Sequence, residues 1–307
     1  PKQSQTSKIL YGIYCAMTLA EVALLKLAGM PLYDSFIHAF STAGTGGFSN
    51  RNASVGAYGD PVLEMIIAVF ALLFSINFAM YFLLLCRRFR EVLQSDELRF
   101  FLVVVGLSTA VIAFNIRHLY QGPLQCLRYA FFQVSSIIST TGFATADFCL
   151  WPQFSQIIFI LLMLCGACAG STGGGIKTTT IFVLAQEIRC IFSKQRPGAF
   201  RRALPANAIA KASTIGLLGM LVVCCTTFLL CILEPGLPFI SLLFEAVSAY
   251  STAGLSTGIT AQLCLPAKLV LIFTMYTGRV GAFTLLSLWV ERPEPNAHFT
   301  EEAITIG

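Results

Sequence analysis

The strongest constraint on the fold of this chain is an internal repeat. Nearly the same four residues occur three times, as Ser41-Thr42-Ala43-Gly44, Ser139-Thr140-Thr141-Gly142 and Ser251-Thr252-Ala253-Gly254. Each copy follows a proline and a short apolar segment, and long apolar segments flank it on both sides. Repetition at matching places indicates one structural unit that is written several times. We therefore predict three units of long helix, short helix, turn and long helix.

The composition places these helices in a membrane. Hydrophobic residues make up 56% of the chain and charged residues 11%, whereas soluble domains carry about 25% charged residues. A helix of about 20 apolar residues crosses a bilayer, and 212–233 is an uncharged segment of that length. The short helices end inside the bilayer, so they are expected to be re-entrant. The net charge of +5 reflects the loops rather than a nucleic-acid partner, because the basic residues form no stripe with interleaved aromatics.

The fold class predicted is thus an all-α polytopic membrane protein with three parallel repeats of helix, re-entrant pore helix and helix. The units cover residues 1–90, 91–202 and 203–307. Their expected outer helices are 9–27, 98–116 and 209–233, their short helices 32–40, 124–138 and 239–250, and their inner helices 61–86, 153–164 and 265–290. The inner helix of the second unit is expected to break at the glycine-rich run 166–175 and to restart at Ile176.

The distribution of basic residues orients the chain in the membrane. Thirteen of the twenty Lys and Arg residues fall on one side of the expected spans. Cytoplasmic loops carry an excess of Lys and Arg. The repeated turns are therefore expected to enter from the outside.

Each repeated turn has the features of a cation site. A short helix that ends inside the membrane presents carbonyl oxygens and the negative end of its dipole, which favour a cation. The following glycine lets the backbone leave the helix, so that several turns around one axis could replace the hydration shell of a monovalent ion. A single Ser-Thr-x-Gly copy is equally expected as an ordinary turn of small residues. Three copies at matching positions favour the filter.

Four segments carry a resemblance to the Trk/Ktr family of potassium-uptake membrane subunits. They are 38–49, 139–147, 168–178 and 250–260. The resemblance implies units around one potassium pathway, with filter glycines Gly44, Gly142 and Gly254 and with Thr42, Thr140 and Thr252 lining the path. The filter would also include Ala43, Thr45, Thr141, Phe143, Ala253 and Leu255. Members of this family carry four units, and the three found match the second, third and fourth. The first is expected upstream of Pro1.

The glycine run resembles the intramembrane loop that gates the pathway in this family. A charge inside a membrane helix is functional by default, and Arg279 is such a charge. We expect Arg279 to hold the loop carbonyls across the pore and to place a positive barrier below the filter. The predicted gate residues are Gly170, Ser171, Thr172, Gly173, Gly174, Gly175, Lys177 and Arg279.

The resemblance also implies partners and a location. These are a second copy of the same subunit, a cytoplasmic nucleotide-binding regulatory subunit, and a multi-pass position in the bacterial plasma membrane. Potassium is expected as the substrate and no cofactor on this chain, so a nucleotide would bind only the regulatory partner. Two alternatives remain, a non-conducting assembly subunit and a secondary transporter of another small solute. The sequence leaves open whether potassium moves as in a channel or by symport with H⁺ or Na⁺.

An enzyme is not predicted. No arrangement of nucleophile, base and orienting residue is visible in the sequence. The segment 170–178 is similar to a phosphate-binding loop, but Ile176 separates Gly175 from Lys177, and no strand pattern precedes the run.

Overall fold

The computed structural model describes residues 3–120, 122–193, 198–199, 202–203 and 206–287. Within these ranges the chain consists of helices and loops, apart from one short antiparallel pair, β1 (Gly198–Ala199) with β2 (Arg202–Ala203). The predicted all-α class is confirmed.

Three long helices have the length and apolarity of membrane spans. They are α1 (Gln3–Leu27), α6 (Asp96–Asn115) and α10 (Ala206–Leu233). Each begins two to six residues before its predicted start. Ser95 caps α6, since its side chain accepts a hydrogen bond from the Leu98 N–H at 3.4 Å. Large side chains such as Leu19, Leu217 and Phe228 remain exposed on α1 and α10, as expected for helices that face lipid. The described chain is therefore a multi-pass membrane protein.

Three short helices follow the long ones, as the sequence predicts. They are α2 (Leu32–Ala43), α7 (Pro123–Ile138) and α11 (Phe239–Ser251). A proline starts each one, at the cap position in α2 and α11 and at the first helical position in α7. Their lengths of 12 to 16 residues correspond to about 18–24 Å, which is less than the bilayer core of about 30 Å.

The inner helix of the first unit differs from its prediction as one span over 61–86. It consists of α3 (Pro61–Ser75) and α4 (Phe78–Leu85), which meet at a bend of 91°, and α5 (Phe89–Leu93) follows. Ile76 is extended at the break, and the Asn77 side chain caps α4 by accepting from the Ala79 N–H at 2.9 Å. The apolar run thus contains a helix stop and a new helix start.

The other two inner helices are also broken. In the second unit α8 (Gln153–Cys165) ends as predicted, and α9 (Thr178–Ser193) resumes after the glycine-rich loop. In the third unit the prediction of a single helix over 265–290 is wrong. Helix α12 (Leu265–Val280) stops at Gly281, whose φ is +93°, and α13 (Ala282–Ser287) follows. The last three residues of that prediction lie outside the described part of the chain.

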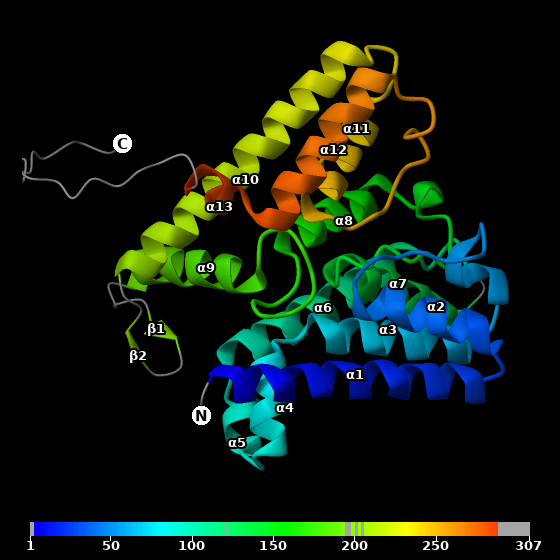
Figure 1. Ribbon diagram of the computed structural model, residues 1–307. Coiled ribbons are helices and arrows are strands. Elements are labelled where there is room, and N and C mark those ends of the chain that lie inside the picture. Colours follow the sequence, from blue (N-terminus) through cyan, green and yellow to red (C-terminus); the bar gives the residue numbers. More distant parts are fainter. Residues whose placement is uncertain (1–2, 121, 194–197, 200–201, 204–205, 288–307) are drawn as a thin grey trace, which may run out of the picture.

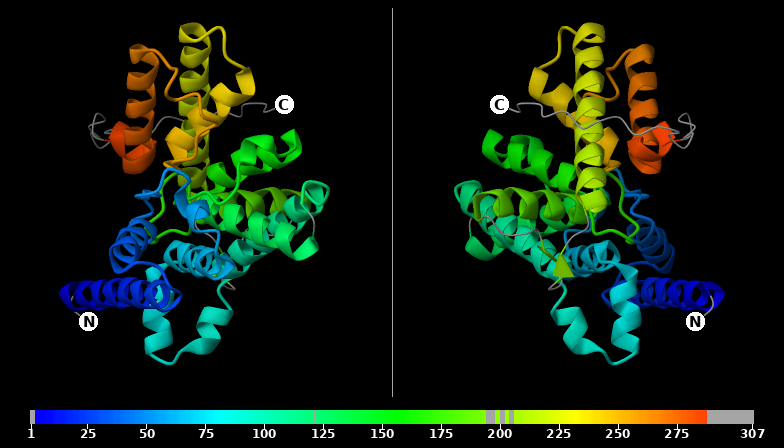
Figure 2. Two further views of the ribbon diagram at one scale, coloured as in Figure 1. Left: turned by 90° about the vertical axis from the view of Figure 1, so that its right-hand side faces the viewer. Right: turned by 90° about the vertical axis from the view of Figure 1, so that its left-hand side faces the viewer.

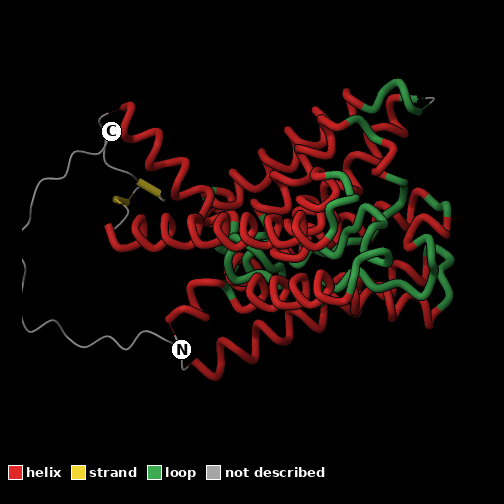
Figure 3. Tube along the Cα trace, turned by 90° about the horizontal axis from the view of Figure 1, so that it is seen from above, coloured by secondary structure: helices red, strands yellow, loops and turns green. Residues whose placement is uncertain are grey.

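The units lie side by side around the glycine-rich loop. Helices α1 to α3 form one group, α6 to α8 the next, and α10 to α12 the group farthest from α1, while α4 and α5 project away from the body (Figures 1 and 2). Contacts of α3 with α7 and of α8 with α11 join the groups. Loops gather between the helices when the molecule is viewed from above (Figure 3). Two short 3₁₀ turns, η1 (Ser54–Tyr58) and η2 (Phe148–Leu150), lie in the loops after the first and second short helices.

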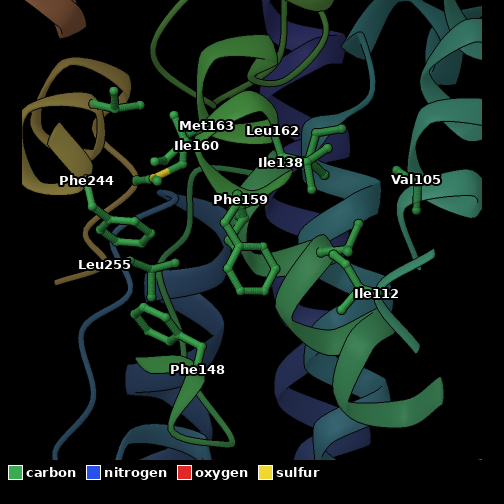
Figure 4. Packing of buried hydrophobic residues seen from close by; sticks show 14 of the residues in the cluster. Val105, Ile112, Ile138, Phe148, Phe159, Ile160, Leu162, Met163, Phe244 and Leu255 are labelled. Atoms are coloured by element: carbon green, nitrogen blue, oxygen red, sulfur yellow. The ribbon is translucent and has the colours of Figure 1, made fainter. Parts of the chain in front are cut away.

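The largest core packs α7, α8 and α11 together. The Phe148 ring stacks on Phe244 with centroids 5.5 Å apart and meets Phe159 edge-on at 6.1 Å. Leu255 lies beside Phe148 and Phe244 in the same cluster (Figure 4). Because Leu255 directly follows the third repeated turn, this core fixes the position of that turn.

Candidate functional site

The three turns that end the short helices share one hydrogen-bond pattern. The N–H groups of Thr45, Thr140 and Thr252 each donate to the carbonyl three residues earlier, at 3.0 to 3.1 Å. The next N–H in each turn donates to the carbonyl five residues earlier, at 2.7 to 3.0 Å. Equal bonds at equal offsets make these three threonines structurally equivalent.

Backbone angles give the same alignment. Thr45, Thr140 and Thr252 have φ values of 51°, 57° and 53°. The glycine two positions after each, at 47, 142 and 254, has a φ of 68°, 87° or 74°. Left-handed angles at β-branched residues are rare and occur where the surroundings enforce them. Each turn is therefore a Thr-x-Gly with the same shape.

In the first unit this turn lies three residues beyond the position that the repeat predicts. Thr42 and Ala43 belong to α2, and Gly44 caps it with a helical φ of −80°. Of the predicted filter residues in this unit, only Thr45 lies in the turn, which continues through Gly46 and Gly47. A signal was available, because glycine followed by Phe or Leu occurs at Gly47-Phe48, Gly142-Phe143 and Gly254-Leu255, each with a serine seven residues before Phe or Leu. The Ser136 hydroxyl donates to the Phe143 carbonyl at 2.7 Å, and the Ser248 hydroxyl donates to the Leu255 carbonyl at 2.6 Å.

The three turns touch one another although about 100 residues separate them in the chain. A Cβ atom at Gly47 would overlap the carbonyl oxygen of Thr141, and one at Gly142 would overlap that of Ala253. At Gly254 the nearest atom to such a Cβ, the Thr141 oxygen, is 3.9 Å away. The structure thus brings the turns 45–47, 140–142 and 252–254 together, with backbone against backbone.

The loop between α8 and α9 is anchored at its start by the break between α3 and α4. The Cys168 N–H donates to the Ser75 carbonyl at 3.1 Å, and the Phe78 N–H donates to the Gly170 carbonyl at 3.2 Å. The Ala169 N–H donates to the Glu97 carboxylate at 3.1 Å. The backbone groups that the helix break releases are therefore partners of this loop.

The tip of the same loop lies against the turns and against α12. The Thr172 carbonyl accepts from Arg279 Nη1 at 3.1 Å and lies 3.2 Å from the Thr45 hydroxyl, whose proton is shared with the Gly44 carbonyl at 2.8 Å. The Gly174 N–H donates to the Thr140 hydroxyl at 2.9 Å, and a Cβ at Gly174 would overlap the Thr252 hydroxyl. Figure 1 shows the loop between the end of α12 and the layer of α3 and α6. The predicted loop residues and Arg279 thus meet at one place, next to all three turns.

Two cations lie at the tip. Lys177 donates from Nζ to the Gly173 carbonyl within its own loop, and Arg279 reaches Thr172 from the last turn of α12. The short helices α2, α7 and α11 end at the turns. The negative ends of their dipoles therefore lie at the turns, opposite the two cations of the loop. The site therefore has carbonyl oxygens in the turns and positive charge at the loop.

Comparison with known proteins gives the family. The TrkH family, described as "Cation transport protein", matches residues 1–298. The chain belongs to this family. It is 34% identical over 305 residues to the Trk system potassium uptake protein TrkH of Salmonella typhimurium, covering 94% of this chain and 62% of that protein. It is 27% identical to the Ktr system potassium uptake protein B of Bacillus subtilis, covering 98% of this chain and 71% of that protein.

A solved TrkH structure has the same fold. The crystal structure of the potassium transporter TrkH from Vibrio parahaemolyticus superposes with a TM-score of 0.84 at 29% identity, covering 94% of this chain and 65% of that one. The predicted resemblance to the Trk/Ktr family is confirmed. TrkH is a family of transport proteins and not of enzymes, and this chain spans about three fifths of the Salmonella relative's length.

Behind the turns, polar side chains of this TrkH member hold the segments that leave them. Glu245 on α11 accepts from the Ser256 hydroxyl at 2.6 Å, the Thr257 N–H at 3.0 Å and the Thr260 hydroxyl at 3.0 Å. His38, at the same position of α2, pairs its Nε2 with the Ser49 hydroxyl at 3.0 Å. A single carboxylate on an apolar helix gave no sequence signal of this role.

At the outer end of α2, Asp34 ties down the segment that leaves the first turn. Hydrogen bonds from the Tyr58 hydroxyl at 2.7 Å, the Asn50 amide at 2.6 Å and Arg51 at 3.2 Å reach its carboxylate. These donors, Tyr58 foremost, lower the pKa of Asp34. The charged form of Asp34 therefore stabilises this arrangement.

Proposed function

We propose that this chain takes up potassium ions across the membrane through a pathway that the turns 45–47, 140–142 and 252–254 line. The names of its relatives support this, because they are potassium uptake proteins and a potassium transporter. The observation that carries the proposal is the meeting of three equivalent Thr-x-Gly turns, each at the C-terminus of a short helix.

The chemistry of the turns suits a dehydrated monovalent cation. Backbone carbonyls and threonine hydroxyls are neutral oxygen ligands, which can replace a hydration shell. The helix dipoles add a negative potential at the same place. In this proposal the filter of the first unit is Thr45, Gly46 and Gly47, and Thr42 and Gly44 support it from the end of α2.

The glycine-rich loop is proposed as the gate of this pathway. Its tip binds the hydroxyls of Thr45 and Thr140 and so lies directly against the filter. Arg279 holds the Thr172 carbonyl and contributes a positive barrier to cations. Opening would require the tip to leave Thr45, Thr140 and Arg279, while the contacts near Ser75 and Glu97 keep the loop attached.

The partners and the location follow the family. We propose a homodimer in the bacterial plasma membrane, controlled by a cytoplasmic nucleotide-binding subunit. The side that carries most basic residues would face that subunit.

Rubidium uptake into proteoliposomes under an imposed membrane potential tests the proposal. The full-length protein is compared with Gly142→Ala, whose Cβ would overlap the Ala253 carbonyl, and with Gly106→Ala, whose Cβ meets no atom within 4 Å. We expect uptake to be lost in the first variant and kept in the second, and to compete with unlabelled potassium.

Equal uptake in Gly142→Ala and the unmodified protein would contradict a pathway along the turns. Absence of uptake in all three, with folded protein and the regulatory subunit present, would favour a non-conducting assembly subunit. Competition by an organic solute instead of potassium would favour a transporter of another solute.

A further inference from the structure

Glu21 is a carboxylate for which the proposed pathway gives no role. It lies in α1, within the membrane-spanning part 7–27, and its side chain is completely buried. Neither carboxyl oxygen has a hydrogen-bond partner among the described residues. An ionised carboxylate in that position would lack both water and a counter-charge, which is a costly state inside a membrane.

Among the described residues, no charged group compensates Glu21. Helix α1 packs against α2, α3 and α4, and four titratable groups on these helices have partners elsewhere. Asp34 pairs with Arg51, His38 with the Asp34 carbonyl and Ser49, Glu64 with Arg128, and the Tyr81 hydroxyl with the Leu73 carbonyl. Tyr33 on α2 and Lys26, Tyr14 and Lys8 on α1 make no hydrogen bond with Glu21. Described residues already enclose both oxygens, so another segment reaches them only by displacing this packing.

Thr42, in the last turn of α2, is the neighbouring side chain that acts on the Glu21 carboxyl, although no hydrogen bond joins the two in this structure. The Thr42 hydroxyl donates its single proton to the His38 carbonyl at 2.8 Å. It therefore offers only lone pairs toward Glu21, and an ionised carboxylate also offers only lone pairs. A protonated carboxyl, in contrast, can donate to the Thr42 oxygen. The number of available protons and the burial of both unpaired oxygens thus fit the neutral form of Glu21.

Thr42 connects this carboxyl to the first turn. Its carbonyl accepts the N–H of Thr45, the residue that begins the left-handed turn. We propose that Glu21 is a proton-binding site behind the first turn, where a bound proton joins α1 to Thr42 and its release changes the turn at Thr45. The reaction is binding and release of a proton at one carboxyl oxygen. It makes α1 a sensor of protons beside the pathway.

Infrared spectroscopy of the reconstituted full-length protein tests the site without a transport assay. A protonated buried carboxyl gives a carbonyl stretching band that shifts in D₂O. We expect one such band at neutral pH in the unmodified protein and its loss in Glu21→Gln. The control is Glu245→Gln, because Glu245 is also buried but its oxygens accept three hydrogen bonds. That variant should keep the band.

Transport supplies a second readout. Rubidium uptake by the unmodified protein should change with pH as Glu21 loses its proton. Uptake by Glu21→Gln, which imitates the neutral form, should stay at the low-pH level of the unmodified protein throughout. Should Glu21→Gln fail to fold, Thr42→Val serves in its place, since it removes the acceptor and should shift the band without abolishing it.

Two infrared results would overturn the proposal. One is a band that persists unchanged in Glu21→Gln. The other is an unmodified protein without the band that gains it when potassium and sodium are replaced by choline, because a metal cation would then hold the site. A band that Glu21→Gln removes, combined with no rubidium uptake in any variant, would keep the proton site and reject the proposed pathway.

Discussion

Thr45, Thr140 and Thr252 hold a backbone conformation that their own side chains disfavour. A left-handed residue costs about 1–3 kcal/mol when it is not glycine, and a β-branched side chain makes the cost larger. The same cost occurs three times, at equivalent positions. Two of the three hydroxyls bind the loop tip. Strain that recurs together with contacts to one loop indicates a constraint from function rather than from folding alone.

The register of the first turn can be tested with two glycine substitutions. In Gly47→Ala the Cβ would overlap the Thr141 carbonyl, and a left-handed alanine costs about 1–2 kcal/mol. In Gly44→Ala the backbone is already helical and the nearest atom is 3.2 Å from the Cβ. We expect rubidium uptake to fall by roughly tenfold or more in Gly47→Ala and to change little in Gly44→Ala. The opposite ranking would restore the register that the repeated tetrapeptide suggests.

Arg279 is expected to hold the loop tip in place. Replacing it with alanine removes the hydrogen bond to the Thr172 carbonyl. Because Arg279 is exposed, we assign this bond about 1 kcal/mol, which is roughly a fivefold change in an equilibrium. Uptake by Arg279→Ala should rise by about that factor, or escape control by the regulatory subunit. Arg117→Ala, an exposed arginine that packs on Phe114, is the matched control, and equal behaviour of the two variants would remove Arg279 from the gate.

At the scale of elements, the break between α3 and α4 and the glycine-rich loop depend on each other. Residues 74, 75 and 78 exchange backbone hydrogen bonds with residues 168, 170 and 172. Inside a membrane a broken helix is tolerated where other protein groups satisfy its freed backbone. The loop supplies those groups, and the break gives the loop its anchor.

The ion pair between α3 and α7 offers a stability test at this scale. Glu64 is buried, and Arg128 Nε lies 3.1 Å from its carboxylate. Removing one partner of a buried pair costs about 3–5 kcal/mol, because the remaining charge is left without compensation. We expect Glu64→Gln to lower the thermal unfolding temperature of the protein in detergent clearly, and Glu64→Gln with Arg128→Gln to recover part of the loss. If the double variant unfolds at the same temperature as the single variant or lower, the interaction between Glu64 and Arg128 does not stabilise the protein.

The sequence predicted the helices better than the breaks and turns between them. Prolines and apolar runs located the short helices, and the glycine run located the break between α8 and α9. The break at Asn77 was hidden, because apolar residues continue on both sides and the stabilising partners lie about 90 residues away. The first turn lies three residues later than predicted because Ser-Thr-Ala-Gly stands there at the end of the helix and not in the turn. In both cases contacts distant in sequence decided the local conformation.

At the scale of the whole molecule, three turns meet. Two of their glycines make close contacts with another turn, and the third does not. Gly47 packs on Thr141 and Gly142 on Ala253, whereas a Cβ at Gly254 would meet no atom closer than 3.9 Å. The chain spans 62% of the Salmonella relative. We propose that a further turn belongs beside Gly254 in the working protein.

Reconstitution checks that proposal. Residues 1–307 alone should take up less rubidium than the same residues supplied with the part of the Salmonella relative that they leave unmatched. Both preparations are examined for folded protein and given the same imposed potential. Equal uptake in the two would show that the three turns suffice.

The contacts between turns also have a direction. The two close contacts run from Gly47 to the Thr141 carbonyl and from Gly142 to the Ala253 carbonyl, while the nearest atom to a Cβ at Gly254 is the Thr141 oxygen at 3.9 Å. In the proposed pathway, moving one turn outward would break its contact with a neighbouring turn, so the width of the opening would depend on the turns as a group. The preference for one cation over another would then depend on how stiffly all the turns are packed together, and not on any single turn. Exchanging one turn for that of a relative should loosen discrimination between cations rather than transfer the preference of that relative.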